Sequence, residues 1–143
     1  MKKLIFAIGL LFFFFLACKT TQSAMETTHS LQGTWELNHI TGPRIAFDGL
    51  YPSKKPTLIF DFNDNKFTGN NSCSQYFGTL KVEGNTISFK DAKRGMTMMT
   101  CSGKGEQVYS STFEKINSYS ISEDGKTLNL LIGDIAMMRF EKK

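Results

Sequence analysis

From residue 31 onward, apolar and polar residues alternate in short runs, and turn-forming residues separate these runs about every ten positions. In the run TLIFDF, Leu58, Phe60 and Phe62 fall on one face. The following NDNK is a turn signal that leads into another run through Phe67. Because successive side chains of a strand point to opposite faces, each run can cover one side of a core. The pattern predicts a mainly β domain, either a small antiparallel barrel or a sandwich.

The same alternation occurs elsewhere in the domain. Trp35 and Leu37 share one face of the first run. Later runs with alternating apolar residues lie at positions 76–82, 87–89, 119–121, 128–132 and 136–140. The last three are joined by turns at EDGK and at Gly133 and Asp134, so they predict a three-stranded meander. We expect about seven or eight strands in total.

One segment has a different period. Tyr109, Thr112, Phe113 and Ile116 recur at the i, i+3, i+4, i+7 spacing of a helix. Ser102 or Gly103 is available near its start as a cap. The sequence therefore predicts one α-helix near residues 104–116, packed on or across the barrel.

The N-terminus has the layout of an export signal. Lys2 and Lys3 form a short basic head, and an apolar run from Leu4 to Ala17 follows. The run is shorter than the roughly 20 residues that a membrane-spanning helix needs. In FLAC, Cys18 directly after Ala17 resembles the lipobox of bacterial lipoproteins, in which the thiol is acylated and the leader is cut before the cysteine. We expect residues 1–17 to be a lipoprotein signal peptide; an ordinary secretory signal with a free cysteine is the alternative.

Lipidation of Cys18 would attach the protein to a membrane of the bacterial cell envelope, since two or more acyl chains suffice for stable anchoring. Lys19 follows the cysteine where aspartate would, by analogy with enteric bacteria, favour the inner membrane. We therefore expect the outer membrane. The sequence leaves open which face of that membrane the domain occupies.

Composition limits the remaining possibilities. Residues 18–30 are polar and lack aromatic residues, so they predict a flexible tether before a single domain at residues 31–143. Cleavage before Cys18 removes Lys2 and Lys3 and lowers the formal net charge from +4 to +2. The remaining basic residues lie in small separate groups. We expect no nucleic-acid partner and a monomeric domain.

Two cysteines remain for the domain, Cys73 and Cys101. In an exported domain such a pair most often forms a structural disulfide, which would contribute about 3 to 4 kcal/mol. A zinc site would need further ligands, and His29 and His39 are far away in sequence and show no ligand spacing. A redox pair is a further alternative, although the chain has no CxxC motif.

Three parts of the sequence carry a family resemblance: GNNSCSQYFGTL, MTMMTC and the following Glu106. They resemble the META domain of the HslJ-like heat-shock lipoprotein family. That family typically shows an opening tryptophan followed by leucine, a Gly-x-x-Gly-Cys-Asn-x-Tyr/Phe-x-Gly core, a Thr-x-Met-Ala-Cys segment and a helix with an acidic residue. The matching residues are Trp35, Leu37, Gly69, Cys73, Tyr76 or Phe77, Gly78, Thr97, Met98 or Met99, Cys101 and Glu106.

Three positions depart from the family pattern: Ser72 replaces a glycine, Ser74 an asparagine and Thr100 an alanine. The resemblance implies a small lipocalin-like β-barrel with one helix, usually on an envelope lipoprotein. It also implies a role in stress tolerance, antibiotic tolerance or motility rather than an established catalytic activity.

The motif residues suit structural roles. Gly69 and Gly78 fit positions of positive φ or of close backbone approach. Thr97 suits a strand edge near the expected Cys73–Cys101 bridge. Glu106 lies in the first turn of the predicted helix, where the helix dipole favours a carboxylate by about 0.3 to 1 kcal/mol.

The methionines are numerous for a small domain, at positions 96, 98, 99, 137 and 138. Their thioethers could bind Cu(I) or act as sacrificial oxidation sites. Met96 and Met98 would point to one side of a strand and Met99 to the other, so this strand alone supplies no three-sulfur face. We expect these residues to fill the core, and we expect no metal or cofactor.

No catalytic signature is present: the chain lacks Gly-x-Ser-x-Gly, HExxH and Walker motifs. We expect a non-enzymatic envelope lipoprotein that binds an envelope protein partner or supports envelope integrity under stress. One alternative is a lipocalin-like carrier of a small apolar ligand, although the domain's phenylalanines can be absorbed by a barrel core. Another is a protease inhibitor that presents the long loop TGPRIAFDGLYPSKKP, with Arg44 and Ile45 at its reactive part.

Overall fold

The structure, a computed structural model, describes residues 31–94 and 103–143. Within these residues one antiparallel sheet contains all ten strands, and two helices accompany it. The elements in chain order are β1 (Gly33–Ile40), α3 (Phe47–Leu50), β2 (Thr57–Asp61), β3 (Lys66–Asn70), β4 (Gln75–Thr79), β5 (Val82–Glu83), β6 (Thr86–Ile87), β7 (Lys93–Arg94), α4 (Gly105–Phe113), β8 (Ser118–Ile121), β9 (Thr127–Ile132) and β10 (Ile135–Lys142).

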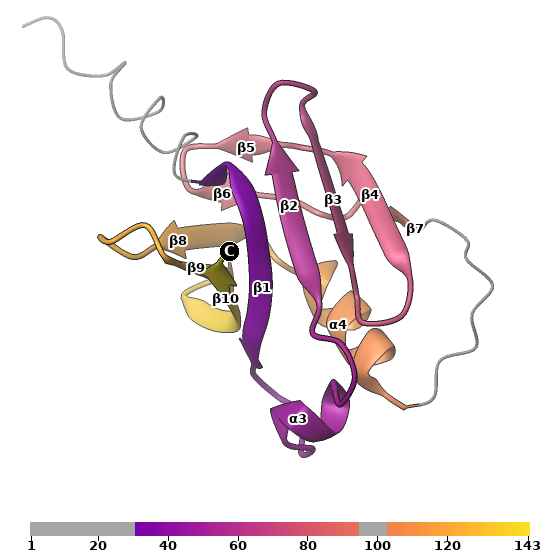
Figure 1. The fold of residues 1–143 in the computed structure, drawn as a ribbon. Coiled ribbons are helices and arrows are strands. Elements are labelled where there is room, and N and C mark those ends of the chain that lie inside the picture. The colour runs from indigo at the N-terminus through magenta and orange to yellow at the C-terminus, as the bar shows by residue number, and fades with distance from the viewer. Residues whose placement is uncertain (1–30, 95–102) are drawn as a thin grey trace, which may run out of the picture.

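The order of the strands shows that the sheet curls. Across the sheet the order is β5-β6-β8-β9-β10-β1-β2-β3-β4-β7, so β5 and β7 are its two ends. In the chain, only Leu80 and Lys81 separate β4 from β5. A link this short spans about 10 Å. The two ends of the sheet must therefore approach each other, and the result is a curled half-barrel with α4 packed against its inner side (Figure 1).

The predicted alternation accounts for the inner face of the first strands. Trp35 and Leu37 on β1, Leu58 and Phe60 on β2, and Phe67 on β3 are all buried. Phe62 lies just beyond the end of β2 and packs against this core while partly exposed. The predicted fold class, a small mainly β antiparallel domain, is confirmed, and the barrel expected from the sequence takes the form of a curled half-barrel.

Helix α4 closes the open side of the sheet with aromatic side chains. Phe113 stacks on Phe89 with 4.0 Å between ring centroids, and it also contacts Tyr76 at 5.1 Å and Tyr109 at 5.3 Å. Phe67 of β3 contacts the same ring edge-on, at 6.1 Å. The helical spacing predicted from the sequence is confirmed, because Tyr109 and Phe113 are buried on one face of α4 and Ile116 is buried just beyond its end.

Four details differ from the sequence-based expectation. The run at 76–82 is divided, since β4 ends at Thr79 and β5 begins at Val82. The sequence shows no alternating pattern at β7, which was therefore not predicted. In total the structure has ten strands, where about seven or eight were expected. Helix α4 ends at Phe113, three residues before Ile116. The short helix α3 lies in the long loop that was expected to be irregular.

The C-terminal meander forms as predicted, with β8, β9 and β10 paired in sequence. The side chain of Ala136, however, lies on the face of the sheet opposite to the one that the sequence pattern predicted. A bulge between Ala136 and Met138 shifts the register of β10 against β9, so Ala136 is exposed while Met138 is buried. An extra residue of this kind breaks strict alternation, which is why the pattern placed Ala136 on the wrong face.

Candidate functional site

Two glycines of the family motif make room for aromatic rings on the neighbouring strand. Gly69 of β3 is paired with Tyr76 of β4, and Phe67 of β3 is paired with Gly78 of β4. A Cβ atom on Gly69 would lie 2.2 Å from the Thr57 carbonyl oxygen and 2.3 Å from the Tyr76 ring. A Cβ atom on Gly78 would lie 2.5 Å from the Phe67 ring. Of the two roles expected for these glycines, the structure shows close approach of a neighbouring aromatic ring. Neither glycine adopts positive φ.

The turn between β3 and β4 is organised by Asn71, which the sequence analysis did not single out. Its side chain is buried, and its Oδ1 accepts hydrogen bonds from the backbone N–H groups of Cys73 (3.2 Å) and Ser74 (2.7 Å). Its Nδ2 donates to Glu106 Oε1 at 3.3 Å and to Ser110 Oγ at 3.4 Å, both on α4. One amide side chain thus shapes the turn and ties it to the helix. The signal for it is the Asn-Asn-Ser run, which favours such side-chain-to-backbone turns.

Ser72 stands where the family pattern has glycine, and the structure explains that preference. Its φ is +85°, in the left-handed region that residues with a Cβ atom rarely adopt. The backbone N–H of Ser72 donates to Asn70 Oδ1 at 2.8 Å, which helps to hold this conformation. Ser74, which stands in place of the family asparagine, is buried in the same turn.

Two tyrosines form a hydrogen-bonded chain in the core. Tyr76 Oη donates to the Thr57 carbonyl at 2.7 Å and lies 2.6 Å from Tyr109 Oη. Because Tyr76 has a single hydroxyl proton, Tyr109 must be the donor between the two rings. Burial raises the pKa of both tyrosines well above the usual range. Tyr51 belongs to the same corner of the fold, since its Oη donates to the Gly105 carbonyl at 3.1 Å and burial raises its pKa to about 12.

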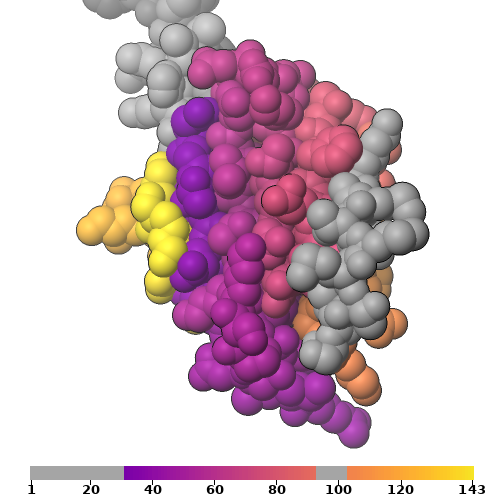
Figure 2. All heavy atoms as spheres, turned by 45° about the vertical axis from the view of Figure 1, so that its right-hand side comes forward, coloured from indigo at the N-terminus to yellow at the C-terminus, as the bar shows by residue number. Residues whose placement is uncertain are grey.

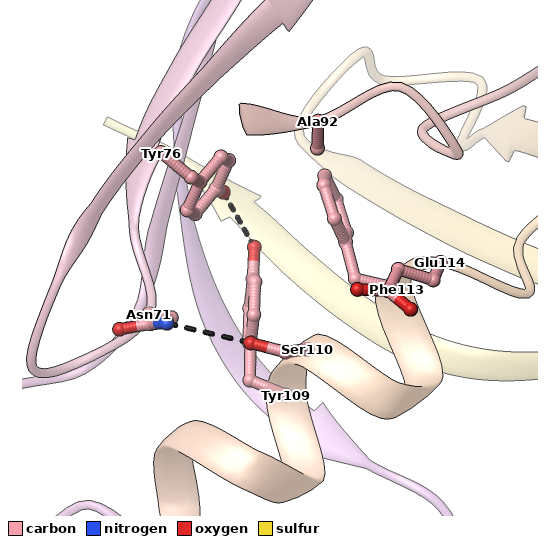
Figure 3. Close-up of a pocket in the computed structure, with 7 residues that line it drawn as sticks. All are labelled: Asn71, Tyr76, Ala92, Tyr109, Ser110, Phe113 and Glu114. Carbon is pink, nitrogen blue, oxygen red and sulfur yellow. Dashed lines mark hydrogen bonds between the residues drawn. The ribbon is translucent and has the colours of Figure 1, made fainter. Parts of the chain in front are cut away.

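A small hollow lies beside the tyrosine pair, and Figure 3 shows the side chains around it. Its volume is about 20 Å³, which is enough for one water molecule. The residues that line it are Asn71, Tyr76, Ala92, Tyr109, Ser110, Phe113 and Glu114. A hollow of this size has no room for a small apolar ligand.

A larger groove lies on the outer face of the sheet, which is the face of β2, β3 and β4 turned away from α4 (Figure 2). Its volume is about 470 Å³. The residues that line it are Lys54, Thr57, Ile59, Thr68, Gly69, Asn70, Gln75, Tyr76 and Phe77. Ile59 is 37% exposed and Phe77 is 47% exposed, so this groove contains two of the large apolar side chains that reach solvent.

The remaining predicted site residues fall into two groups. Trp35 is fully buried, with its Nε1 donating to the Leu31 carbonyl at 2.8 Å, and Glu106 lies in the first turn of α4 as predicted. Cys73 is partly buried in the turn after β3. Cys18, Thr97, Met98 and Cys101 lie outside the described residues, so the lipid site, the disulfide and the second motif segment stay predictions.

The long loop of residues 41–56 is not a uniform exposed loop. Leu50 and Tyr51 are buried, and Phe47 contacts the Tyr51 ring at 5.1 Å. Arg44 and Ile45 are exposed. Pro52, Ser53, Lys54 and Lys55 after α3 are also exposed. The loop therefore has two exposed parts, one on each side of α3, that a protease-binding loop could present.

In residues 31–94 and 103–143, no three histidine, cysteine or carboxylate side chains lie close enough together to hold a metal ion. Over the same residues, no helix is both long enough and apolar enough to cross a membrane.

Comparison with known proteins gives a family and a fold. The sequence model of the META domain matches residues 18–143. No curated protein matches the sequence. An NMR structure of a protein from Burkholderia xenovorans is similar, with a TM-score of 0.63 and 17% identity, covering 89% of this chain and 93% of that one. A crystal structure of a DUF4847 family protein from Bacteroides vulgatus is also similar, with a TM-score of 0.55 and 13% identity, covering 82% of this chain and 97% of that one.

Proposed function

Because this chain belongs to the META domain family, we propose that it is a non-enzymatic binding protein of the bacterial cell envelope, anchored by lipid at Cys18 and engaging a protein partner. The short apolar run after Lys2 and Lys3 supports export, and the position of Cys18 supports lipidation. Support of envelope integrity under stress would follow from that binding.

The observation that carries the binding proposal is the difference between the interior and the outer face. The interior beside α4 is filled with stacked aromatic rings, and the hollow there holds about 20 Å³. The outer face carries a groove of about 470 Å³ with two exposed apolar side chains. Exposed apolar groups with a polar rim are typical of protein interfaces. These features favour partner binding over the carrier alternative.

We also propose that Cys73 and Cys101 form a structural disulfide. Cys73 lies in the turn that Asn71 ties to α4, and Cys101 precedes the start of α4 at Gly105 by a few residues. A bridge would reinforce the same connection between turn and helix, with about 3 to 4 kcal/mol of stabilisation. Peptide mass spectrometry with and without reduction tests it: two hydrogens should be missing from the linked peptide. Two free thiols would contradict the pairing.

The anchor is tested by expressing the full chain with its leader in bacteria and separating the membranes. The wild-type protein should be in the outer membrane, and Cys18→Ser should release it or leave it uncleaved. Lys19→Asp should move the protein to the inner membrane, whereas Lys19→Ser, a matched control, should not. A wild-type Cys18 peptide without acyl chains would refute lipid anchoring.

Partner binding is tested in the same cells with an amine-reactive crosslinker, which joins lysines of neighbouring proteins. The wild-type chain should give a discrete band at higher mass, and the band should weaken in Cys18→Ser because the protein leaves its membrane. Absence of any crosslinked species at native expression would count against a protein partner.

A further inference from the structure

The exposed side chains of the outer face form an ordered row. Ile59 of β2 is paired with Thr68 of β3, and Thr68 is paired with Phe77 of β4. Neighbouring strands lie about 4.8 Å apart, so Ile59 and Phe77 stand about 10 Å apart with Thr68 between them. The two apolar side chains therefore flank a shallow position wide enough for one inserted side chain.

Beside this row lies a second, polar row. Thr57, Asn70 and Gln75 are paired across the same three strands, two residues along from the first row. Lys54, three residues before Thr57 in the chain, also lines the groove. Among the described lining residues Lys54 carries the only formal charge, and it is positive. Within the described part of the chain, no hydrogen bond or ion pair engages the side chains of Lys54, Thr68 and Gln75.

The backbone of β3 has no open hydrogen-bonding edge for a partner. Strand β3 is hydrogen-bonded along its length to β2 on one side and to β4 on the other. A bound peptide therefore cannot extend the sheet at β3, because strand addition requires an open edge. Recognition must rely on side chains: an apolar contact between Ile59 and Phe77, hydrogen bonds from the polar row, and the charge of Lys54.

We propose that this outer-face groove binds an acidic segment of a protein partner, with one apolar side chain seated between Ile59 and Phe77 and a carboxylate against Lys54. The inference rests on the proposed partner-binding function and adds the surface and the chemistry of the partner. The uncompensated positive charge of Lys54 favours an acidic segment, and the exposed ring of Phe77 supplies the apolar anchor that protein interfaces use.

The test uses a displayed library of short random linear peptides, selected against the full chain purified from the fraction that contains it. Enriched peptides should combine an aromatic or aliphatic residue with aspartate or glutamate. One enriched peptide is then synthesised and titrated against variants. Phe77→Thr should weaken binding about tenfold, and Lys54→Glu about threefold with a weaker dependence on salt.

The matched controls are equivalent changes elsewhere on the surface. Ile135 is 63% exposed at the β9–β10 hairpin, and Lys126 is exposed in the turn between β8 and β9. Ile135→Thr and Lys126→Glu should leave the affinity of the peptide unchanged. Circular dichroism of every variant shows whether its fold is intact.

The outcomes separate this inference from the proposed function. Enriched peptides without acidic residues, or binding that Phe77→Thr and Lys54→Glu leave intact, would overturn the groove assignment. If the crosslinked band in cells persists in both groove variants, the partner-binding function stands while the groove assignment falls. A library that yields no binder to the folded wild-type chain also overturns the groove assignment.

Discussion

The two faces of β3 and β4 differ in what their side chains contact. On the inner face, Phe67 and Tyr76 lie over Gly78 and Gly69 and pack against α4. On the outer face, Thr68 and Phe77 point to solvent beside the groove. The motif residues Gly69, Tyr76 and Gly78 all serve the inner face. Of the two candidates for the aromatic motif position, Tyr76 therefore serves the fold, while Phe77 and Lys54 on the outer face are the side chains that we propose for binding.

The largest expected effect is at Gly69, where the inner face has no space for a Cβ atom. Gly69→Ala would place that atom 2.2 Å from the Thr57 carbonyl oxygen and 2.3 Å from the Tyr76 ring. The backbone oxygen belongs to a paired strand and cannot move freely, so we expect a loss of about 3 kcal/mol in the free energy of unfolding. Denaturant titration measures this loss.

The control for Gly69 is its neighbour on the other face. Thr68→Ala changes a half-exposed side chain on the same strand, and we expect it to alter the free energy of unfolding by less than about 0.5 kcal/mol. Equal effects of the two substitutions would mean that the two faces do not differ as described.

The second expected effect concerns the buried tyrosines and appears at alkaline pH. Burial raises the pKa of Tyr76 and Tyr109 in the folded protein, while the unfolded chain keeps the ordinary value of 10.0. Above about pH 10 the unfolded state releases these protons and the folded state retains them, so stability is complete below that pH and falls as pH rises. Tyr76→Phe should cost about 1 kcal/mol at neutral pH through its lost hydrogen bonds.

The same variant should show a weaker decline in stability above about pH 10, because one member of the buried pair with raised pKa is gone. The free energy of unfolding, measured at about pH 8 and at about pH 11, gives both the loss from the missing hydrogen bonds and the decline at alkaline pH. Tyr119→Phe is the comparison, since Tyr119 also has a raised pKa but its Oη donates to the Gly84 carbonyl outside the pair. A decline in Tyr76→Phe as steep as in the wild type would refute the assignment of alkaline sensitivity to this pair.

The sequence predicted the inner face well and the outer face poorly. Alternation of Trp35 and Leu37, and of Leu58 and Phe60, depends on burial, which is the property that periodicity reports. The helical spacing of Tyr109 and Phe113 was read for the same reason. The two-residue strands are too short to show a period, which explains why β7 was missed and why β4 and β5 were merged.

The site required information that no local pattern contains. Asn71 contacts Glu106 and Ser110, which are more than thirty positions away in the chain, so only the fold brings them together. The alternation places Ile59 and Phe77 opposite the core faces of their strands, but it does not show that the two residues are neighbours. Pairing across β2, β3 and β4 reveals that they are neighbours on an exposed face.

The third expected effect is a gain in stability at the turn between β3 and β4. Ser72 has φ of +85°, which glycine adopts without a clash of Cβ with the backbone. Ser72→Gly should raise the free energy of unfolding by about 0.5 to 1 kcal/mol, and thermal denaturation should show a higher midpoint. Asn65→Gly is the matched comparison, because Asn65 also has positive φ, +50°, but asparagine tolerates this region. Destabilisation by Ser72→Gly would mean that the serine side chain contributes more than its strained backbone costs.

A small effect on stability is also expected at Phe77, and this is where the comparison of the two faces is sharpest. Phe77→Thr keeps a residue that favours strands and removes a ring that is 47% exposed, so we expect a change below about 1 kcal/mol. Denaturant titration of this variant beside Gly69→Ala compares neighbouring strands at opposite faces. A large loss would indicate that the ring supports the fold, and the outer face would then share the structural role of the inner one. A small loss leaves the exposed ring without a structural reason, which is the condition expected of a side chain that packs only when a partner is bound.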